Sequence, residues 1–134
     1  MRNMKVDVRA LGEALAARLN SELPLGCWLT CGTVEGWGGV ALFMNTAEGS
    51  WGGSGIAESR NAIDAEELPF VTERILDAIQ DDVAEATRGI AWPTDPKSSV
   101  PLPEPWAKVT GDVLSFGYGS LTLVERLPLA ELAT

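Results

Sequence analysis

The chain has 134 residues, of which 46% are hydrophobic and 22% are charged, and it contains no histidine and only two cysteines. This composition excludes a disordered chain, and the net charge of −9 disfavours nucleic acid, whose phosphates the protein would repel. Without histidine, the usual proton shuttle and the most common metal ligand are both missing. We therefore expect one globular domain over residues 1–134, and neither a triad hydrolase nor a zinc protein.

No stretch of the sequence predicts a membrane helix or a secretion signal. The longest uncharged stretch, 23–34, is interrupted by Pro24, Gly26 and Gly32. The N-terminus carries charged residues where a signal peptide needs an apolar segment. We therefore expect a soluble, cytoplasmic protein without a membrane partner.

The first predicted element is a helix that begins after Asp7, a residue type that caps helix N-termini. Two β-prone runs follow over 27–34 and 40–45, and a weaker, glycine-rich strand is predicted over 50–57. The apolar residues of the helix recur at spacings of three and four, as one helical face requires: Val8, Leu11, Leu15, Leu19 and Leu23.

A second helix is predicted between Asp64 and Gly89. Asp64 and Glu67 have the spacing of a capping box, and Gly89 suits the left-handed end of a helix. One arc of this helix is apolar, and an acidic arc faces solvent. Asp82 lies at the border of the apolar arc, where a carboxylate needs a partner, so it is a candidate binding residue.

The last third of the chain begins with a proline-rich connection over 93–105, in which five prolines favour an extended course over a helix or a central strand. Three further strands are predicted after it, over 106–110, 113–118 and 121–126. Two-residue turns at the Gly111-Asp112 and Gly119-Ser120 steps would join them into a meander.

These elements predict an α+β fold in the order α-β-β-(β)-α-β-β-β. We expect a mostly antiparallel sheet of five or six short strands, with two amphipathic helices packed on one face. In the strand over 113–118, the large side chains alternate onto the face that covers the helices, and they are Leu114, Phe116 and Tyr118. The small residues between them are expected to form a face open to solvent or to a partner.

The sequence contains no complete motif for a metal, a cofactor or a catalytic group. Cys27 and Cys31 would lie about 13 Å apart on a strand, too far for a disulfide, and two thiols alone do not make a zinc site. The acidic run 81–85 has cation-binding spacing, but no second acidic helix completes it. The glycine-rich stretch 49–55 lacks the lysine of a phosphate loop. We assign no catalytic, metal or cofactor-binding residue and expect no cofactor.

Five tryptophans are an unusual number for a chain of this length, and most lie beside glycine or proline at the ends of predicted elements. Tryptophan is enriched where proteins bind partners, so these side chains are candidates to hold a partner or a ligand. The alternative is that wide side chains cover the ends of a small core. With Asp82, the candidate binding residues are Trp37, Trp51, Trp92 and Trp106.

Two classes of function follow from these observations. The preferred one is a small acidic, non-catalytic protein-interaction module, as a monomer or a homodimer, that binds a protein partner of neutral or basic charge. In size, acidity and order of elements the chain is similar to secretion chaperones and some immunity proteins, although it carries no motif of either. The alternative is a small-molecule-binding protein or a metal-independent enzyme with a pocket between sheet and helices.

Overall fold

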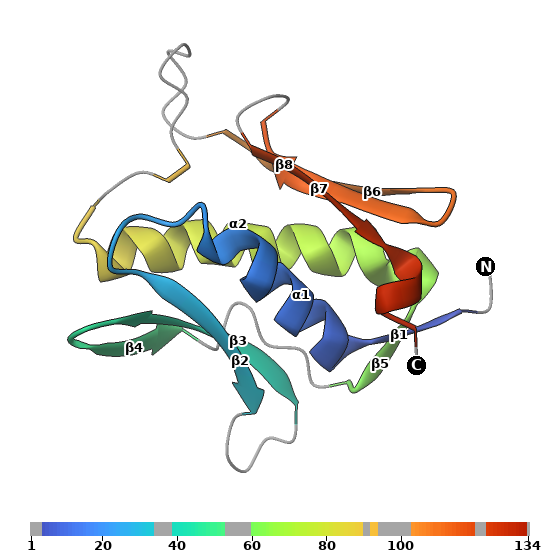
Figure 1. Ribbon diagram of the computed structural model, residues 1–134, viewed down its shortest axis with the longest axis horizontal. Coiled ribbons are helices and arrows are strands. Elements are labelled where there is room, and N and C mark those ends of the chain that lie inside the picture. Colours follow the sequence, from blue (N-terminus) through green and yellow to red (C-terminus); the bar gives the residue numbers. More distant parts are fainter. Residues whose placement is uncertain are drawn as a thin grey trace.

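The computed structural model describes residues 4–33, 39–52, 60–89, 92–93, 103–119 and 123–133, and Figure 1 shows their arrangement. Its helices and strands follow the predicted order, with two short strands added. In chain order they are β1 (Lys5–Asp7), α1 (Val8–Asn20), β2 (Trp28–Thr33), β3 (Val40–Thr46), β4 (Gly49–Gly52), β5 (Ala62–Asp64), α2 (Leu68–Ala86), β6 (Pro105–Thr110), β7 (Val113–Tyr118) and β8 (Leu123–Pro128). Single 3-10 turns at Ala65–Glu67 and Leu129–Glu131 complete the set.

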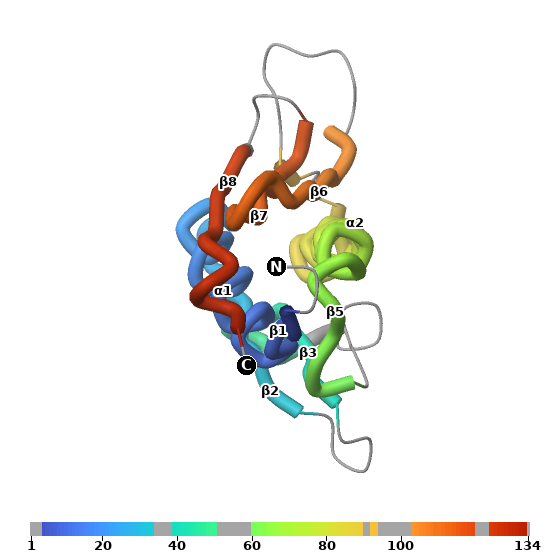
Figure 2. Tube along the Cα trace, turned by 90° about the vertical axis from the view of Figure 1, so that its right-hand side faces the viewer, coloured from blue at the N-terminus to red at the C-terminus, as the bar shows by residue number. Residues whose placement is uncertain are grey.

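The α+β class is confirmed, but the strands form three small antiparallel sheets instead of one. The sheets pair β1 with β5, β2 with β3 and β4, and β6 with β7 and β8. Figures 1 and 2 show α1 and α2 side by side in a middle layer, with β6–β8 on one side of them and β2–β4 on the other. The helices are therefore covered on two faces, because each meander buries its own apolar face against them.

The helix ends follow the predicted capping chemistry. Asp7 precedes α1 and its carboxylate accepts a hydrogen bond of 3.0 Å from the backbone N–H of Arg9. Asp64 and Glu67 form the predicted capping box around the 3-10 turn that leads into α2. At the other end of α2 the prediction is off by one residue: Arg88 takes the left-handed position with a φ of 60°, and Gly89 follows it with a φ of 112°.

The inner face of β7 carries the side chains that join β6–β8 to the helices. Leu114, Phe116 and Tyr118 are completely buried, as their alternation predicts. The Tyr118 hydroxyl donates a hydrogen bond of 2.7 Å to the carbonyl of Leu76 in α2. Burial of the phenol raises its pKa well above the usual value, with the negative charge of Asp77 adding to the effect. Tyr118 therefore stays protonated and fixes β7 against α2.

The strands β1 and β5 are absent from the sequence prediction. They pair across 57 residues of chain, Val6 with Ile63, and both of these side chains are buried. Three residues are too few to show a period of two. The backbone N–H of Asp7 also donates to the carbonyl of Leu132, at 2.8 Å, so the two ends of the described chain lie together. None of the described helices combines the length and the apolar character that crossing a membrane requires.

Candidate functional site

The outer face of β6–β8, the face turned away from the helices, carries two rows of side chains fixed by strand register. In one row, Trp106 on β6 and Val124 on β8 flank Gly117 on β7. In the other row, Lys108 and Arg126 flank the central residue of β7 in the same way, and that residue is Ser115. Register therefore places an apolar pair beside a cationic pair on one sheet face.

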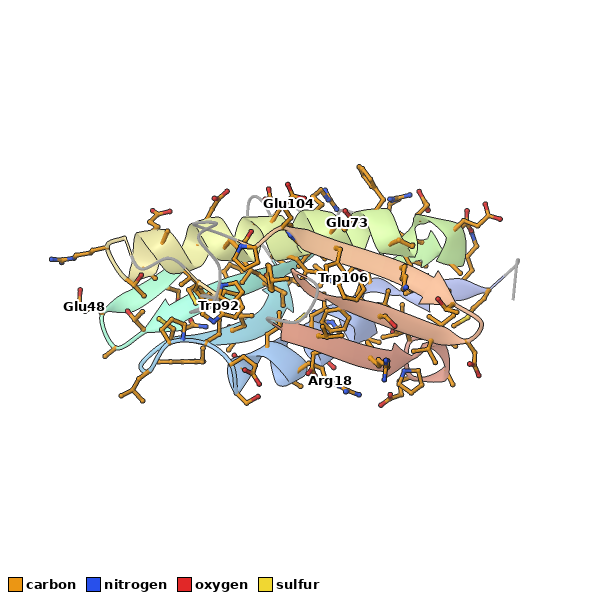
Figure 3. The ribbon with its side chains drawn as sticks, turned by 90° about the horizontal axis from the view of Figure 1, so that it is seen from above. Arg18, Glu48, Glu73, Trp92, Glu104 and Trp106 are labelled. Carbon is orange, nitrogen blue, oxygen red and sulfur yellow. The ribbon has the colours of Figure 1, made fainter. Side chains whose placement is uncertain are left out.

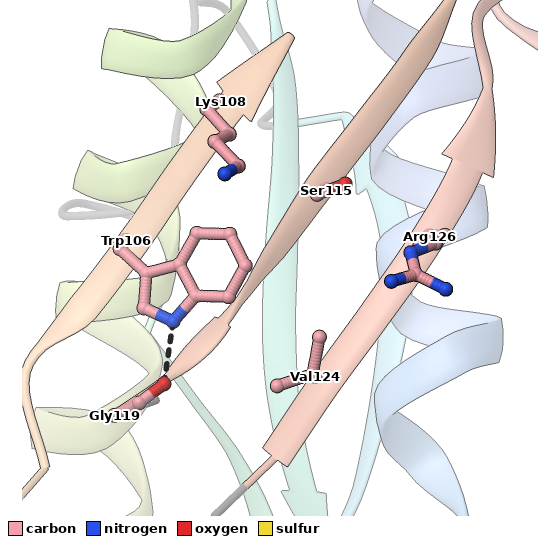
Figure 4. A pocket seen from close by; sticks show the side chains of 6 residues that line it. All are labelled: Trp106, Lys108, Ser115, Gly119, Val124 and Arg126. Atoms are coloured by element: carbon pink, nitrogen blue, oxygen red, sulfur yellow. Dashed lines mark hydrogen bonds between the residues drawn. The ribbon is translucent and has the colours of Figure 1, made fainter. Parts of the chain in front are cut away.

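These residues line a shallow hollow of about 480 Å³, which Figure 4 shows from close by. Its floor has little side chain, because Gly117 has none and Ser115 has only a hydroxymethyl group. Val124 at one wall is 39% exposed, and the indole of Trp106 forms the opposite wall. Figure 3 looks onto this face and labels Trp106 on it. The hollow therefore offers both apolar surface and positive charge to a ligand.

Trp106 is held in place by the backbone of the strand beside it. Its indole N–H donates a hydrogen bond of 2.6 Å to the carbonyl of Gly119, just after β7 (Figure 4). The cross-strand neighbour Gly117 has no side chain, so the ring can lie down over β7. The indole is partly buried and presents its remaining surface to the hollow.

The two cations of the hollow have no carboxylate partner among the residues that the structure describes. This is notable in a chain with 19 acidic and 10 basic residues. Other cations of the described chain are in ion pairs with acidic side chains, namely Lys5–Asp64, Arg9–Glu13, Arg18–Glu125, Arg60–Glu67 and Arg88–Glu48. Ser115, between the two cations, likewise makes no side-chain hydrogen bond within the described part. The outer face of β6–β8 thus has polar groups without a partner among the described residues.

The predicted tryptophans are not brought together. Trp106 lines the hollow, whereas Trp92 is only 7% exposed. Trp92 donates its indole N–H to the carbonyl of Glu22 at 2.7 Å and contacts Tyr118 edge to face, with ring centroids 5.1 Å apart. Burial leaves Trp92 without the surface that a partner would contact, and it covers one end of the core, as the alternative interpretation states. Trp37 and the side chain of Trp51 lie outside what the structure describes.

Asp82 lies on α2, away from the hollow, and is half-buried. No hydrogen bond or ion pair joins its carboxylate to any described residue. Desolvation, reinforced by the negative charges of Glu85 and Asp81, raises the pKa of Asp82 to about 6. The partner that its position calls for is not supplied by the described chain, and Asp82 does not share a site with Trp106.

A second hollow, of about 500 Å³, lies between the loop after α1, the β3–β4 turn and the end of α2. Leu25 on its rim is fully exposed. Its charged groups, Glu48 and Arg88, face each other at 4.0 Å and partly neutralise one another. This hollow therefore offers a ligand fewer unpaired charged groups than the outer face of β6–β8 does.

Cys27 and Cys31 are free thiols, as their spacing predicts. Burial raises the pKa of both, and for Cys31 the nearby charge of Arg9 opposes the effect only in part. Neither thiol is therefore activated as a nucleophile at neutral pH. Within the described ranges, no three side chains of the metal-binding types come together as a metal site.

Sequence reasoning missed Lys108 and Arg126. They are 18 positions apart in the chain. They lie in one row only because Lys108 on β6 and Arg126 on β8 both pair with Ser115 on β7. Comparison of the chain with protein-family models, with curated proteins and with solved structures finds no match. The assignment of the candidate site therefore depends on the geometry of these residues alone.

Proposed function

We propose that the protein is a small, non-catalytic interaction module that binds a partner protein on the outer face of β6–β8. The observation that carries this proposal is the pair Lys108 and Arg126, which lie in one row without a carboxylate partner from the described chain. Beside them, Trp106 and Val124 present apolar surface. Aromatic and arginine side chains that adjoin on one face are typical of protein-binding hot spots.

The chemistry of the site favours binding over catalysis. Ser115 makes no hydrogen bond to a base in the described structure, and the chain contains no histidine that could activate it. The hollow is shallow and open, and a lysine and an arginine side by side can attract a negative group. These properties support a docking surface.

The alternative, a small-molecule pocket between sheet and helices, has less support. The side chains that point from β7 toward α2, such as Phe116 and Tyr118, are completely buried, and the phenol is hydrogen-bonded to the helix backbone. This interface is filled by side chains in the described part of the chain. The proposal also includes a cytoplasmic setting and a partner of neutral or basic net charge, because a chain of charge −9 repels acidic proteins at long range. A homodimer is a separate assembly to test for, because a second copy carries the same charge of −9.

Native mass spectrometry on protein purified gently from its own host tests the proposal. We expect an added mass of several kilodaltons, from a partner protein, that is lost in the Arg126→Glu variant. Arg88→Glu is the matched control, because it reverses the same charge at an exposed position in the second hollow. An added mass of a few hundred daltons would favour the small-molecule alternative. A protein partner that stays bound to Arg126→Glu would place the binding surface elsewhere.

A further inference from the structure

We infer that the outer face of β6–β8 selects an extended segment of its partner that carries an apolar side chain two positions from a carboxylate. This inference rests on the proposed function and names the chemistry of the segment. It follows from the spacing of the two rows and from the positive charge there, which no described carboxylate neutralises.

The cationic row is a site for a carboxylate. Lys108 and Arg126 lie on the strands that flank β7, so their backbones are about 10 Å apart. A carboxylate above Ser115 lies between the two, within reach of both long side chains and of the serine hydroxyl. Arginine can donate two parallel hydrogen bonds to the two oxygens of a carboxylate. A carboxylate in this position supplies the partner that both cations lack within the described chain.

The apolar row is a site for a hydrophobic side chain. Gly117 opens space between Trp106 and Val124, and the indole N–H of Trp106 already has its partner in Gly119. The surface that remains toward the hollow is the ring itself and the exposed methyl groups of Val124, which is 39% exposed. An aliphatic or aromatic side chain placed there buries apolar area on both walls.

The distance between the rows sets the spacing of the ligand. Gly117 and Ser115 are two residues apart on β7, which corresponds to about 7 Å along a strand. In an extended peptide, side chains at positions i and i+2 point to the same side with the same separation. An extended segment that lies along β7 therefore places one side chain in each row.

The negative net charge of the chain restricts the context of that carboxylate. A strongly acidic partner would be repelled by a protein of charge −9 before it reached the hollow. The recognised carboxylate therefore belongs to a partner that is neutral or basic as a whole. The net negative charge repels acidic proteins at long range, and the cationic row attracts a single carboxylate at short range. Together they favour a carboxylate on a neutral or basic protein over one on an acidic protein.

A displayed library of random eight-residue peptides, panned against the full chain, tests this inference. The Lys108→Gln/Arg126→Gln double variant is the counter-selection. The matched control is Arg9→Gln/Arg88→Gln, which removes the same charge from exposed positions on other surfaces. Circular dichroism establishes that each variant is folded.

We expect enriched peptides that share an apolar residue two positions from aspartate or glutamate. Replacing that acid by its amide in a synthetic peptide should weaken binding about tenfold, as loss of two partly exposed charge contacts predicts. The double variant should bind the acid and amide peptides equally, and the control should behave as wild type. Equal binding of both peptides by wild type would overturn the inference, as would a phosphoserine peptide that binds tenfold more tightly than the glutamate peptide.

Failure of the inference is distinguishable from failure of the proposed function. Peptides that bind the outer face of β6–β8 without a carboxylate would support the interaction surface and refute the acidic motif. Loss of their binding to Val124→Glu would show that they bind this face. If no peptide binds wild type better than Val124→Glu, both the motif and the docking surface are refuted.

Discussion

The two three-stranded sheets cover opposite sides of the same helix pair. Their outer faces differ in whether the polar side chains have partners within the described chain. On β2–β4, the Asn45 side-chain amide donates to the hydroxyl of Thr30 at 3.0 Å, and its oxygen accepts from the hydroxyl of Ser50 at 2.6 Å. On β6–β8, the polar groups of Lys108 and Arg126 have no such partners in the described chain. The polar groups around Asn45 are hydrogen-bonded to one another, whereas Lys108 and Arg126 have no partner among the described residues.

This difference shows that similar strand architecture does not decide how the polar groups of an outer face are paired. Both sheets are antiparallel and bury large apolar side chains against the helices. The difference lies in a few side chains on the outer faces. On β2–β4, the short amide of Asn45 bonds to its neighbours, whereas on β6–β8 the long side chains of Lys108 and Arg126 form no such bonds with described residues. Long charged side chains also lose more conformational entropy when they are ordered, so an ordered contact of Lys108 or Arg126 must offset a larger cost than one of Asn45.

The largest expected effect tests whether the inner faces are equivalent. Phe116→Ala on β7 and Met44→Ala on β3 each remove a fully buried side chain that faces the helices. We expect each to lower the free energy of unfolding by about 2–5 kcal/mol, since truncation in a core leaves a cavity. Urea unfolding measures both. A loss below about 1 kcal/mol for either would show that its sheet does not share the cooperative core.

The next effect concerns the satisfied outer face. Asn45→Ala should lower stability by about 1–2 kcal/mol, because it removes hydrogen bonds that join β2, β3 and β4. Thr46→Ala is a control on the same strand, outside the bonds of Asn45. Thermal unfolding followed by circular dichroism compares the two. If Asn45→Ala were as stable as wild type, the contrast between the two sheets would disappear.

A third effect lies on α2, the helix that both sheets cover, and it depends on pH. The folded state raises the pKa of Asp82 from 3.8 to about 6, so the native protein binds this proton more tightly than the unfolded chain does. The contribution of Asp82 to the free energy of unfolding therefore falls as the pH rises from about 3.8 to about 6. Asp82→Asn should be more stable than wild type at pH 7.5, by about 1 kcal/mol after allowance for solvent screening.

The gain from Asp82→Asn should vanish below about pH 3, where the aspartate is protonated in both states. Denaturant unfolding at the two pH values measures it. Asp81→Asn removes the same charge from an exposed neighbour and serves as control. An equal gain at both pH values would contradict the role assigned to burial.

The smallest effect sharpens the contrast most directly. Lys108→Gln and Arg126→Gln should each change the free energy of unfolding by less than about 0.5 kcal/mol, because neither cation supports another described group. Chemical denaturation, with Asn45→Ala measured alongside, provides the comparison. A loss above 1 kcal/mol would mean that these cations hold the fold together, and the available face would then be structural.

Sequence patterns predicted those elements whose signals are local. The caps at Asp7 and Asp64 and the alternation of Leu114, Phe116 and Tyr118 each depend on neighbours a few residues away. The assignment of strands to three sheets was not predicted, because it depends on which apolar faces meet in space. Pairing such as that of Val6 with Ile63 leaves no periodic trace in so short a strand.

The candidate site was predicted only in part, and register explains why. A two-residue turn at Gly119-Ser120 would pair Tyr118 with Leu121, whereas the structure pairs Tyr118 with Leu123. That shift of two positions brings Arg126, instead of Val124, opposite Ser115. Trp106 was found because tryptophan is rare and conspicuous; its two cationic neighbours are common residue types whose meaning comes from their placement.

For the proposed recognition, the hydrogen bond from Trp106 to the carbonyl of Gly119 has a consequence for kinetics and selectivity. An aromatic side chain that is free in solution must be immobilised when a ligand arrives, at a cost of about 0.5–1.5 kcal/mol. Here folding has already fixed the ring, so association needs no rotamer search by the indole. A ligand must instead match a wall that does not adapt to it, which makes the shape of the apolar residue a criterion for entry.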